Sequence, residues 1–452
     1  MRVHCPAFSF QKGLIASELN VHSSETFREL MVHRKPRRYQ PLVAFLRSGL
    51  RHQVMIGANA DEWRRTRDAI DPELQAANVA ARYAPIIQQV AADAFSRLAG
   101  DTAATSGSEV FIEPLMRTVT LSILGHMLFG NVLPFDEASQ MEGILTTSTE
   151  AAKGGIVEWV NRLFGAIFGA LRAGEYQPVL FSPRRREAAD RVLAWISERI
   201  DRTKRAGLRT PLLERLEQRY ADRPRSRRKR AIVAEYAMMC IAGIETTAAA
   251  LTLAIAEIAN DDTLRASVVK EAREQGCPAG GAQGVVARFP LLHCVFRETL
   301  RRHTIVPTFL RETEKDYTLV TDHPDSGTNQ PIRVSRGTTL RYLPFLGHLR
   351  RTVWADPHRF DPCRFAGPLS SEQAENYMPF GFGPQRCPGH AMATTETILI
   401  LAEFFRRFDI EPGKTAKKGI ALKRNVIFTN RPVGVTARVR PVQAGAGKGG
   451  TS

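Results

Sequence analysis

Hydrophobic residues recur at three- and four-residue intervals over much of the chain between about residues 60 and 310. This spacing places them on one face of an α-helix. It predicts helices over 74–99, 109–129, 186–206 and 211–221. A further segment, 156–172, is apolar on a wide face with glycine breaks, which fits a mobile lid, a lipid-contacting patch or plain core. Because the pattern alone shows no site that this segment would cover, we expect it to belong to the hydrophobic core.

Strand patterns are sparse and late in the chain. They cover Tyr317–Val320, Pro331–Val334, Thr338–Tyr342 and a tail that ends in VTARVRPV. There is no internal repeat, and the informative motifs run from residue 63 to residue 389. The pattern predicts a mainly α (α+β) protein with one large domain over 1–440 and a flexible tail, rich in small residues, over 441–452.

The longest apolar segment, 231–259, follows the basic stretch RPRSRRKR and has the length of a membrane span. Glu235, Glu245 and Glu257 lie inside it, and a carboxylate in lipid costs several kcal/mol. We therefore expect a central helix buried in a globular protein. A carboxylate is expensive in a protein core as well, so Glu245, in the middle of the segment, is a functional candidate.

Composition narrows the class of protein. The 452 residues are 43% hydrophobic and 24% charged, as in soluble globular proteins. The net charge of +17 suits an acidic protein partner, an anionic membrane surface or nucleic acid. The cationic residues are scattered without a nucleic-acid-binding motif, so we expect no nucleic acid partner. No two of the six cysteines form a CxxC pair, and the amino terminus lacks a signal-peptide pattern. Both facts predict a cytoplasmic, soluble protein without a transmembrane segment.

The strongest chemical motif is FGFGPQRCPG, from Phe380 to Gly389. Gly381 and Gly383 allow a tight turn and a close approach to a bulky group. Pro388 fits the first turn of a helix, so Cys387 should lie at a helix start, where the dipole lowers the pKa of a thiol. A structural cysteine after a glycine turn is the alternative.

This segment resembles the heme-binding loop of the cytochrome P450 family, Phe-x-x-Gly-x-Arg-x-Cys-x-Gly. It matches at Phe380, Gly383, Cys387 and Gly389. The resemblance implies heme b as cofactor and Cys387 as the axial ligand of its iron. The neighbouring loop residues would contact the heme: Phe380, Gly381, Gln385 and Gly389. Gln385 departs from the family, which has a basic residue there to hold a heme propionate.

Three further motifs resemble the same family. Glu298 and Arg301 match its Glu-x-x-Arg helix, and Arg364 would complete a structural network with them, although Cys363 replaces the usual glutamate. Trp63 and Arg67, four apart on a helix, match a pair that binds a heme propionate. Arg311 lies where many members place another propionate-binding arginine. Trp63 comes some thirty residues earlier than in the family, so the first helix and the amino-terminal sheet should be shortened.

The stretch AGIETT, 242–247, resembles the family's oxygen-activation motif. Ala242 leaves room for substrate and dioxygen. The Thr246 hydroxyl can bond the carbonyl four residues back and open a polar notch. Glu245 can relay protons beside it. A satisfied polar defect in a core helix is the alternative reading.

The resemblance implies a P450 fold, a large helical domain with small β-sheets and the heme between the central helix and the Cys387 loop. The expected activity is a heme-thiolate monooxygenase of secondary metabolism, which inserts one atom of O2 into a small or medium-sized organic substrate. No flavin or iron–sulfur segment is seen, so electrons would come from a ferredoxin or flavodoxin with its NAD(P)H reductase, bound to a basic face that includes Arg350, Arg351 and Arg386. Oxidative coupling, desaturation or ring formation is one alternative, and a heme-thiolate sensor is another. The substrate pocket should be lined by residues 44–56, 156–170, 238–247, 305–310 and 424–429.

Overall fold

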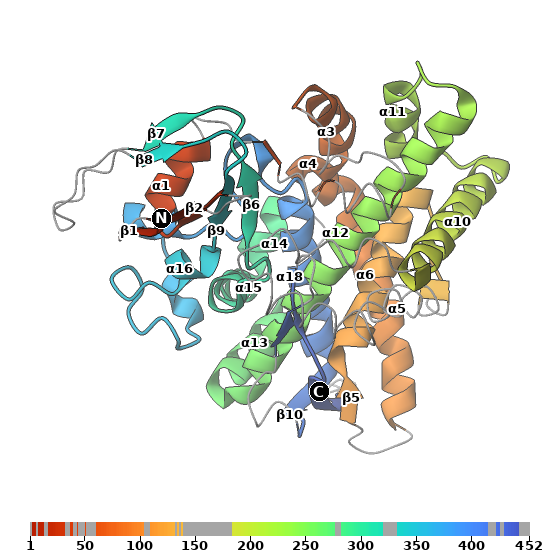
Figure 1. The fold of residues 1–452 in the computed structure, drawn as a ribbon. Helices are drawn as coiled ribbons and strands as arrows, with labels where there is room; N and C mark the ends of the chain where they lie inside the picture. Colours follow the sequence, from red (N-terminus) through yellow and green to blue (C-terminus); the bar gives the residue numbers. More distant parts are fainter. Residues whose placement is uncertain are drawn as a thin grey trace, which may run out of the picture.

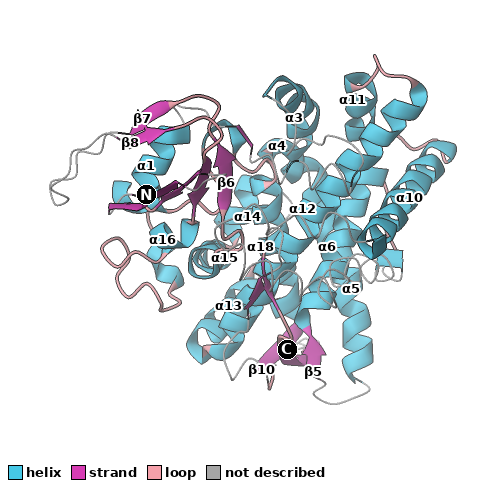
Figure 2. Ribbon diagram, in the orientation of Figure 1, coloured by secondary structure: helices cyan, strands magenta, loops and turns pink. Residues whose placement is uncertain are grey.

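The structure is a computed structural model. It describes residues 2–5, 8–12, 17–31, 37–38, 43, 50, 60–103, 109–131, 133–134, 137–138, 183–275, 282–319, 332–414, 422–424 and 429–442. The segment 156–172 and most of the expected pocket segments 44–56 and 424–429 lie outside these residues. Within them, helices form most of the molecule and the strands gather in small sheets (Figures 1 and 2). The mainly α prediction is confirmed.

The α-helices are α1 (Ser24–Glu29), α3 (Ala60–Leu74), α4 (Ala76–Asn78), α5 (Ala84–Ala103), α6 (Ile112–Phe129), α10 (Pro183–Arg205), α11 (Pro211–Arg219), α12 (Arg225–Asn260), α13 (Asp262–Glu274), α14 (Ala282–Arg288), α15 (Pro290–His303), α16 (Pro344–His348), α17 (Ser371–Asn376) and α18 (His390–Arg407). A π-helical turn, η2 (Val79–Tyr83), and two 3-10 turns, η4 (Pro362–Phe365) and η5 (Gly383–Gln385), lie between them. The segment 74–99, predicted as one helix, is therefore divided. Its π-turn ends just before Pro85, which has no N–H to continue a regular helix.

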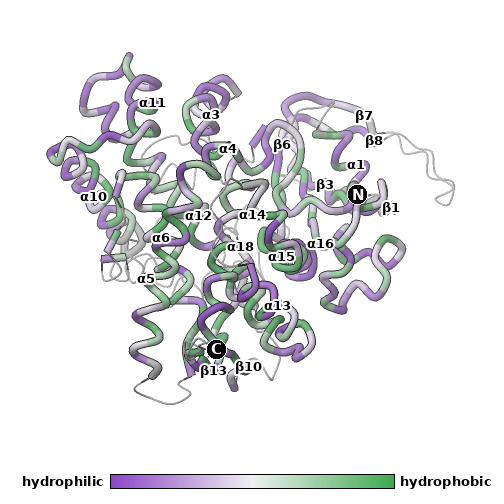
Figure 3. Tube along the Cα trace, turned by 180° about the vertical axis from the view of Figure 1, so that it is seen from behind, coloured by the Kyte–Doolittle hydropathy of each residue, from purple (hydrophilic) through white to green (hydrophobic). Residues whose placement is uncertain are grey.

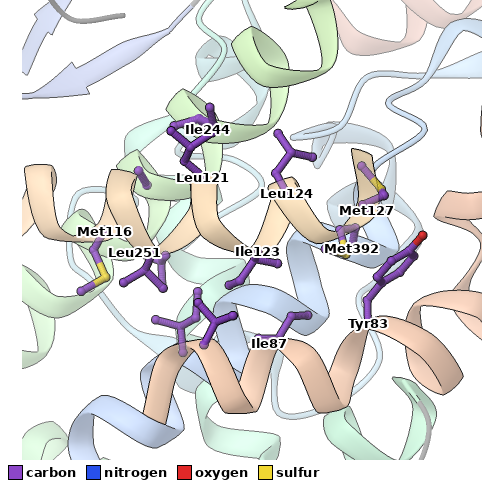
Figure 4. Packing of buried hydrophobic residues seen from close by; sticks show 14 of the residues in the cluster. Tyr83, Ile87, Met116, Leu121, Ile123, Leu124, Met127, Ile244, Leu251 and Met392 are labelled. Atoms are coloured by element: carbon purple, nitrogen blue, oxygen red, sulfur yellow. The ribbon is translucent and has the colours of Figure 1, made fainter. Parts of the chain in front are cut away.

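Helix α12 runs through the middle of the molecule and contacts α6, α10, α15 and α18 (Figure 1). Ile244 and Leu251 of α12 lie along α6, beside Leu121 and Met116, whereas Met392 of α18 lies near Met127 further along α6 (Figure 4). The outer helices α3 and α10 are mostly hydrophilic (Figure 3). The long apolar segment is thus a core helix, as predicted. By length and composition it could cross a membrane, but 72% of its apolar window is buried in the protein.

The glutamates of α12 each have a polar partner from another element. Glu235 accepts a hydrogen bond from Tyr220 at 3.1 Å, and Glu257 lies 2.7 Å from the ring nitrogen Nε2 of His303. Glu245 contacts Arg117 of α6. These contacts offset the cost of placing carboxylates on a core helix.

The strands of the described residues form four sheets. The largest has the order β1–β2–β3–β9–β6–β4, with strands β1 (Arg2–Cys5), β2 (Phe8–Lys12), β3 (Ser17–Val21), β4 (Arg37–Arg38), β6 (Phe309–Glu312) and β9 (Thr339–Tyr342). The others pair β10 (Phe408–Pro412), β13 (Thr436–Pro441) and β5 (Glu109–Phe111), then β11 (Leu422–Arg424) with β12 (Asn430–Pro432), and β7 (Tyr317–Leu319) with β8 (Ile332–Val334). Strand β3 pairs in parallel with β9, so an early and a late segment of the chain share one sheet.

Two expectations about the ends of the chain are corrected. Strands are not confined to the late part of the sequence, because β1, β2 and β3 form an antiparallel meander near the amino terminus. Each has four or five residues of mixed polarity, too few to show a periodic signal, and the meander is completed by pairing with the distant β9. The tail does not begin at 441: Pro441 belongs to β13, and the Val442 amide donates to the Arg407 carbonyl at 2.8 Å.

Candidate functional site

The Cys387 loop is a compact turn between α17 and α18. Gly381 and Gly383 have φ values of +77° and +69°, a region that favours glycine because side chains there are strained. The Cys387 amide donates to the Phe380 carbonyl at 2.8 Å, which closes the loop. The tight turn that the sequence predicts at the two glycines is therefore present.

The position of Cys387 relative to the helix differs from the prediction. Helix α18 begins at His390 with Gly389 as its N-cap residue, so the cysteine precedes the helix instead of opening it. Burial raises the pKa of the Cys387 thiol, while the Gly389 amide and the Arg67 and Arg386 guanidinium groups lower it by smaller amounts. The sequence predicted a lowered pKa for this thiol. Desolvation outweighs the amide and guanidinium contributions, so the pKa is raised instead. The side chain is nevertheless accessible to solvent.

Helix α12 is open at the predicted oxygen-activation motif. Ala242 is exposed, although the residues from Ala231 to Cys240 are all buried. The Thr246 hydroxyl donates to the Ala242 carbonyl at 2.7 Å, the back-bond that the sequence predicts. One turn further on, Ala249 and Ala250 pack in a cluster with Phe296, against which Phe380 of the cysteine loop lies. The loop is therefore held on the same helix that exposes Ala242.

Glu245 belongs to a buried chain of charges. Its carboxylate lies 3.7 Å from Arg117, which is 2% exposed, and accepts a hydrogen bond from Thr429 at 3.3 Å. Arg117 also lies 3.7 Å from Glu113, and Glu113 accepts two bonds from Arg431 at 2.8 and 3.1 Å. Thr246 follows Glu245 by about 100° around the helix. The printed contacts of Glu245 thus lead towards α6 and β12, whereas the Thr246 hydroxyl is turned onto its own helix.

A group of arginines lies near the cysteine loop. Arg67 of α3 donates to the Arg386 carbonyl at 2.9 Å, pairs with Asp71 at 2.6 Å, and lies 5.7 Å from the centre of the Trp63 ring. Arg311 of β6 is 8% exposed and donates to the Leu310 carbonyl. Its Nε finds no hydrogen-bond partner among the described residues, and burial lowers its pKa to about 10.

A third arginine, Arg38, joins this group. It stands opposite Arg311 in the β4–β6 ladder, and its pKa falls well below the usual value through burial and through the neighbouring charges of Arg311 and Arg67. Nearby, the amide oxygen of Gln385 is buried without a partner among the described residues. Arg38 was not predicted as a site residue, because no motif surrounds it in the basic stretch HRKPRR.

The predicted structural network is assembled from α15 and the turn η4. Arg301 donates to both carboxylate oxygens of Glu298 at 2.7 Å, and Arg364 lies 3.5 Å from Glu298. Arg301 also donates to the carbonyls of His348 and Pro357 at 2.8 and 2.9 Å. Glu298 and Arg301 are fully buried. Because these carbonyls belong to the segment before the cysteine loop, the network fixes that segment on α15.

Comparison with known proteins agrees with this geometry. The family model described as Cytochrome P450 matches residues 17–437. The chain belongs to the cytochrome P450 family. Membership implies a heme-iron cofactor, and the residues present fit one: an exposed cysteine on a glycine turn, an exposed Ala242 on the central helix, and the buried Arg311, whose Nε has no hydrogen-bond partner among the described residues.

Individual P450 relatives are distant. A "Probable cytochrome P450 6v1" of Drosophila melanogaster is 30% identical over 52% of this chain and 46% of its own length. The "25-hydroxyvitamin D-1 alpha hydroxylase, mitochondrial" of Homo sapiens is 23% identical over 84% of this chain and 74% of its own. The "Cytochrome P450 monooxygenase milC" of Cordyceps militaris is 29% identical over 38% and 33%. The chain spans less than half the length of the first curated relatives it matches.

Proposed function

We propose that the protein is a heme-thiolate monooxygenase that binds heme b through Cys387. The observation that carries the proposal is the accessible Cys387 thiol on a loop anchored to the helix that exposes Ala242. Phe380, Gly381 and Gly389 would frame the thiolate. Trp63, Arg67, Arg311 and the Gln385 amide would meet the propionates, and Glu298, Arg301 and Arg364 would hold the surrounding fold. When bound, the heme supplies dioxygen activation, which an electron-rich thiolate ligand favours.

The chain's own contribution is positioning and proton movement. Ala242 would leave space for substrate and dioxygen, and the Thr246 hydroxyl would donate to a bound oxygen atom once it leaves its bond to the Ala242 carbonyl. Glu245 would then be the titratable group that resupplies the proton. Its contacts to Arg117 and Thr429 hold it towards α6, so delivery requires the carboxylate to turn away from them.

The electron donors would be separate proteins of the ferredoxin or flavodoxin type with an NAD(P)H reductase. Arg350, Arg351 and Arg386 are exposed, which supports a basic docking face for an acidic partner. We also propose one cooperative domain, supported by the sheets that join early and late strands, and a cytoplasmic location with a role in secondary metabolism. Cell fractionation tests the location.

The axial ligand gives the decisive test. Dithionite-reduced protein with CO should show the red-shifted Soret band of thiolate ligation. Cys387→Ser should abolish this band, whereas Cys363→Ser, at the exposed cysteine of η4, should keep it. A wild-type spectrum of a histidine-ligated heme would overturn the proposal.

Oxygen chemistry needs its own measurement. With surrogate redox partners and a substrate found by spectral screening, Thr246→Ala should keep the CO spectrum but give roughly ten-fold less product per NADH, with hydrogen peroxide in its place. Wild-type coupling in this variant would exclude Thr246 from proton delivery. Product mass separates oxygen insertion from coupling or desaturation, which remove two hydrogens. Absence of NADH consumption would favour a sensor.

A further inference from the structure

Two of the cysteines lie at the contact between helix α15 and the turn η4. Cys294 of α15 is 8% exposed and packs in a cluster with Val353, Trp354 and Phe365. Cys363 of η4 is exposed and lies two residues before Phe365 on the same turn. The contact therefore carries one covered thiol and one thiol that is open to solvent.

Polar contacts on both sides of Cys363 hold η4 against α15. The Asp361 amide donates to the Glu298 carboxylate at 2.9 Å, and Arg364 lies 3.5 Å from the same carboxylate. Glu298 follows Cys294 on α15 by four residues, which is about one helical turn. The backbone of Cys363 is therefore fixed beside the part of α15 that carries Cys294.

The two thiols are also close enough for the charge of one to affect the other. Burial raises the pKa of the Cys294 thiol, and the Arg297 guanidinium opposes that rise. Smaller contributions from Glu271 and Cys363 add to it. Because solvent and salt screen charges that are far apart, an effect of Cys363 on Cys294 agrees with the packing of η4 on α15.

The chemistry of position 363 sets this chain apart from the family pattern, which has a glutamate there. A thiol in that place exchanges a fixed charge for a group that can be oxidised. Cys363 is exposed and Cys294 lies beneath it at the rim of the core. An accessible cysteine next to a second cysteine that can react with its oxidised form is the arrangement of redox-sensitive sites.

We propose that Cys363 and Cys294 form a reversible disulfide bond that joins η4 to α15, with hydrogen peroxide as the oxidant. The source of the peroxide rests on the proposed heme-thiolate function, which releases it when oxygen activation is not coupled to product. Formation of the bond itself needs only the two thiols and the oxidant. In a reducing compartment the bond would persist only while peroxide is present.

The exposed thiol reacts first. The Cys363 thiolate attacks one oxygen atom of the peroxide, the O–O bond breaks, a sulfenic acid forms, and the hydroxide that leaves takes up a proton to become water. The Cys294 thiol then loses its proton and its sulfur attacks the Cys363 sulfur. The S–O bond breaks and the second hydroxide leaves as water. Two thiols and one peroxide thus become one disulfide and two water molecules, and a dithiol donor reverses the oxidation by exchange.

The bond would reinforce the network of Glu298, Arg301 and Arg364. That network holds the segment before the cysteine loop on α15, and the disulfide would close the chain from residue 294 to residue 363 around it. A covalent loop of this kind stabilises a protein mainly by restricting its unfolded state. The oxidised protein should therefore resist unfolding under the conditions in which peroxide is released.

Mass spectrometry of the heme-loaded full chain tests the bond. After a short pulse of hydrogen peroxide stopped with catalase, free thiols are blocked with maleimide in denaturant and the protein is digested with trypsin without reductant. The peptides 289–297 and 360–364 should be found joined, with the mass of two hydrogen atoms missing, and should separate after dithiothreitol. Cys363→Ser and Cys294→Ala should each remove the joined peptide. Cys240→Ser, at a buried cysteine of α12, is the matched control and should keep it.

Urea unfolding of the oxidised and the reduced protein measures the effect of the bond on stability. The midpoint should move to a higher urea concentration on oxidation and return after dithiothreitol. In Cys363→Ser the midpoints before and after the peroxide pulse should coincide. Equal midpoints in the wild-type protein, with the joined peptide present, would contradict the proposed reinforcement of the network.

Two results of the digest would overturn the inference. One is recovery of Cys363 as a maleimide adduct or a sulfonic acid with no joined peptide, which would make it a surface cysteine without a partner. The other is a joined peptide that pairs Cys363 with a different cysteine. If Cys294→Ala does not accumulate as folded protein, Cys363→Ser still decides, because its side chain is exposed.

The two proposals fail separately. Absence of the thiolate CO band in the wild-type protein removes the proposed function, whether or not added peroxide joins the two peptides. A normal band without the joined peptide removes this inference alone.

Discussion

Two buried charge clusters in this molecule are built on opposite rules. In the chain Glu245–Arg117–Glu113–Arg431 the signs alternate, and each neighbour lies within salt-bridge distance of the next. In the group Arg38, Arg67 and Arg311 three positive charges lie close together, and Arg67 pairs with Asp71 at its edge. The charges of the first cluster are paired with one another, whereas the Nε donor of Arg311 in the second has no hydrogen-bond partner among the described residues.

The largest effect should follow from breaking the alternating chain at its centre. Arg117→Met leaves Glu113 and Glu245 without their shared cation, and loss of one partner of a buried ion pair costs about 3–5 kcal/mol. Urea unfolding of the heme-loaded protein should show this loss. Arg191→Met, at an exposed ion pair on α10, should cost less than about 0.5 kcal/mol. Adding Glu245→Gln to Arg117→Met should recover part of the loss, and an unrelieved double variant would contradict the alternating arrangement.

Glu396, a buried carboxyl group outside both clusters, should make the stability of the protein depend on pH. Glu396 of α18 is 4% exposed, its Oε1 has no partner among the described residues, and burial raises its pKa to about 8. In the unfolded chain this carboxyl ionises near pH ~4.3, so between that pH and about 8 the folded state binds more protons. Stability should therefore fall as pH rises through this window, by about 1.4 kcal/mol per pH unit.

Glu396→Gln removes the titration. The variant should lose this component of the pH dependence and be more stable than the wild type at pH 8. Urea midpoints at pH 5, 6.5 and 8 check it. Parallel curves for the two proteins would mean that Glu396 stays ionised with a partner.

A smaller effect should distinguish a hydroxyl group that bonds to Glu245 from one that bonds only to the backbone of α12. Thr429→Val keeps the shape but removes the donor to Glu245, at a cost of about 1 kcal/mol. Thr252→Val is the matched control, because its hydroxyl donates to the Ala248 carbonyl of the same helix. Equal unfolding free energies for the two variants would show that the Thr429 contact adds nothing to the alternating chain.

The smallest effect should be seen when the heme-free protein binds an anion at the group Arg38, Arg67 and Arg311. Sulfate should stabilise the heme-free full chain by less than about 1 kcal/mol, because an anion that binds the folded state shifts the unfolding equilibrium. Chloride at the same ionic strength is the control for screening. The sulfate effect should vanish in Arg311→Gln but persist in Arg333→Gln, which removes an exposed arginine of β8. A sulfate effect retained in Arg311→Gln would place the anion elsewhere.

The parts of the site that lie on one helix or in one short motif could be predicted from the sequence. The Thr246 back-bond and the positive φ angles of Gly381 and Gly383 are local consequences of residue type. The partners of Glu245 were out of reach, because Arg117 and Thr429 come from segments on either side of α12 with no pattern that links them. Arg38 was missed for the same reason, since its meaning arises from the ladder with Arg311.

The fold shows the same division. The periodic helices were predicted from the sequence. The predicted bounds of the late strands β7, β8, β9 and β13 agree with the structure to within one or two residues. The early strands were not located from the sequence, because they are short, of mixed polarity, and joined to the rest of the sheet by the non-local pairing of β3 with β9. The predicted lowering of the Cys387 pKa was wrong. A helix terminus can be predicted from a sequence, but the burial that raises this pKa cannot.

The pairing of β3 with β9 sets the order in which the protein can be completed during synthesis. Ser24, just after β3, bonds to the Tyr342 hydroxyl across 318 residues of chain, so the amino-terminal meander leaves the ribosome long before its partner strand exists. Until then it carries an unpaired edge, and such edges associate with other chains. A chaperone that covers extended segments would therefore be needed early, and a ribosome stalled before residue 339 would release an aggregation-prone fragment.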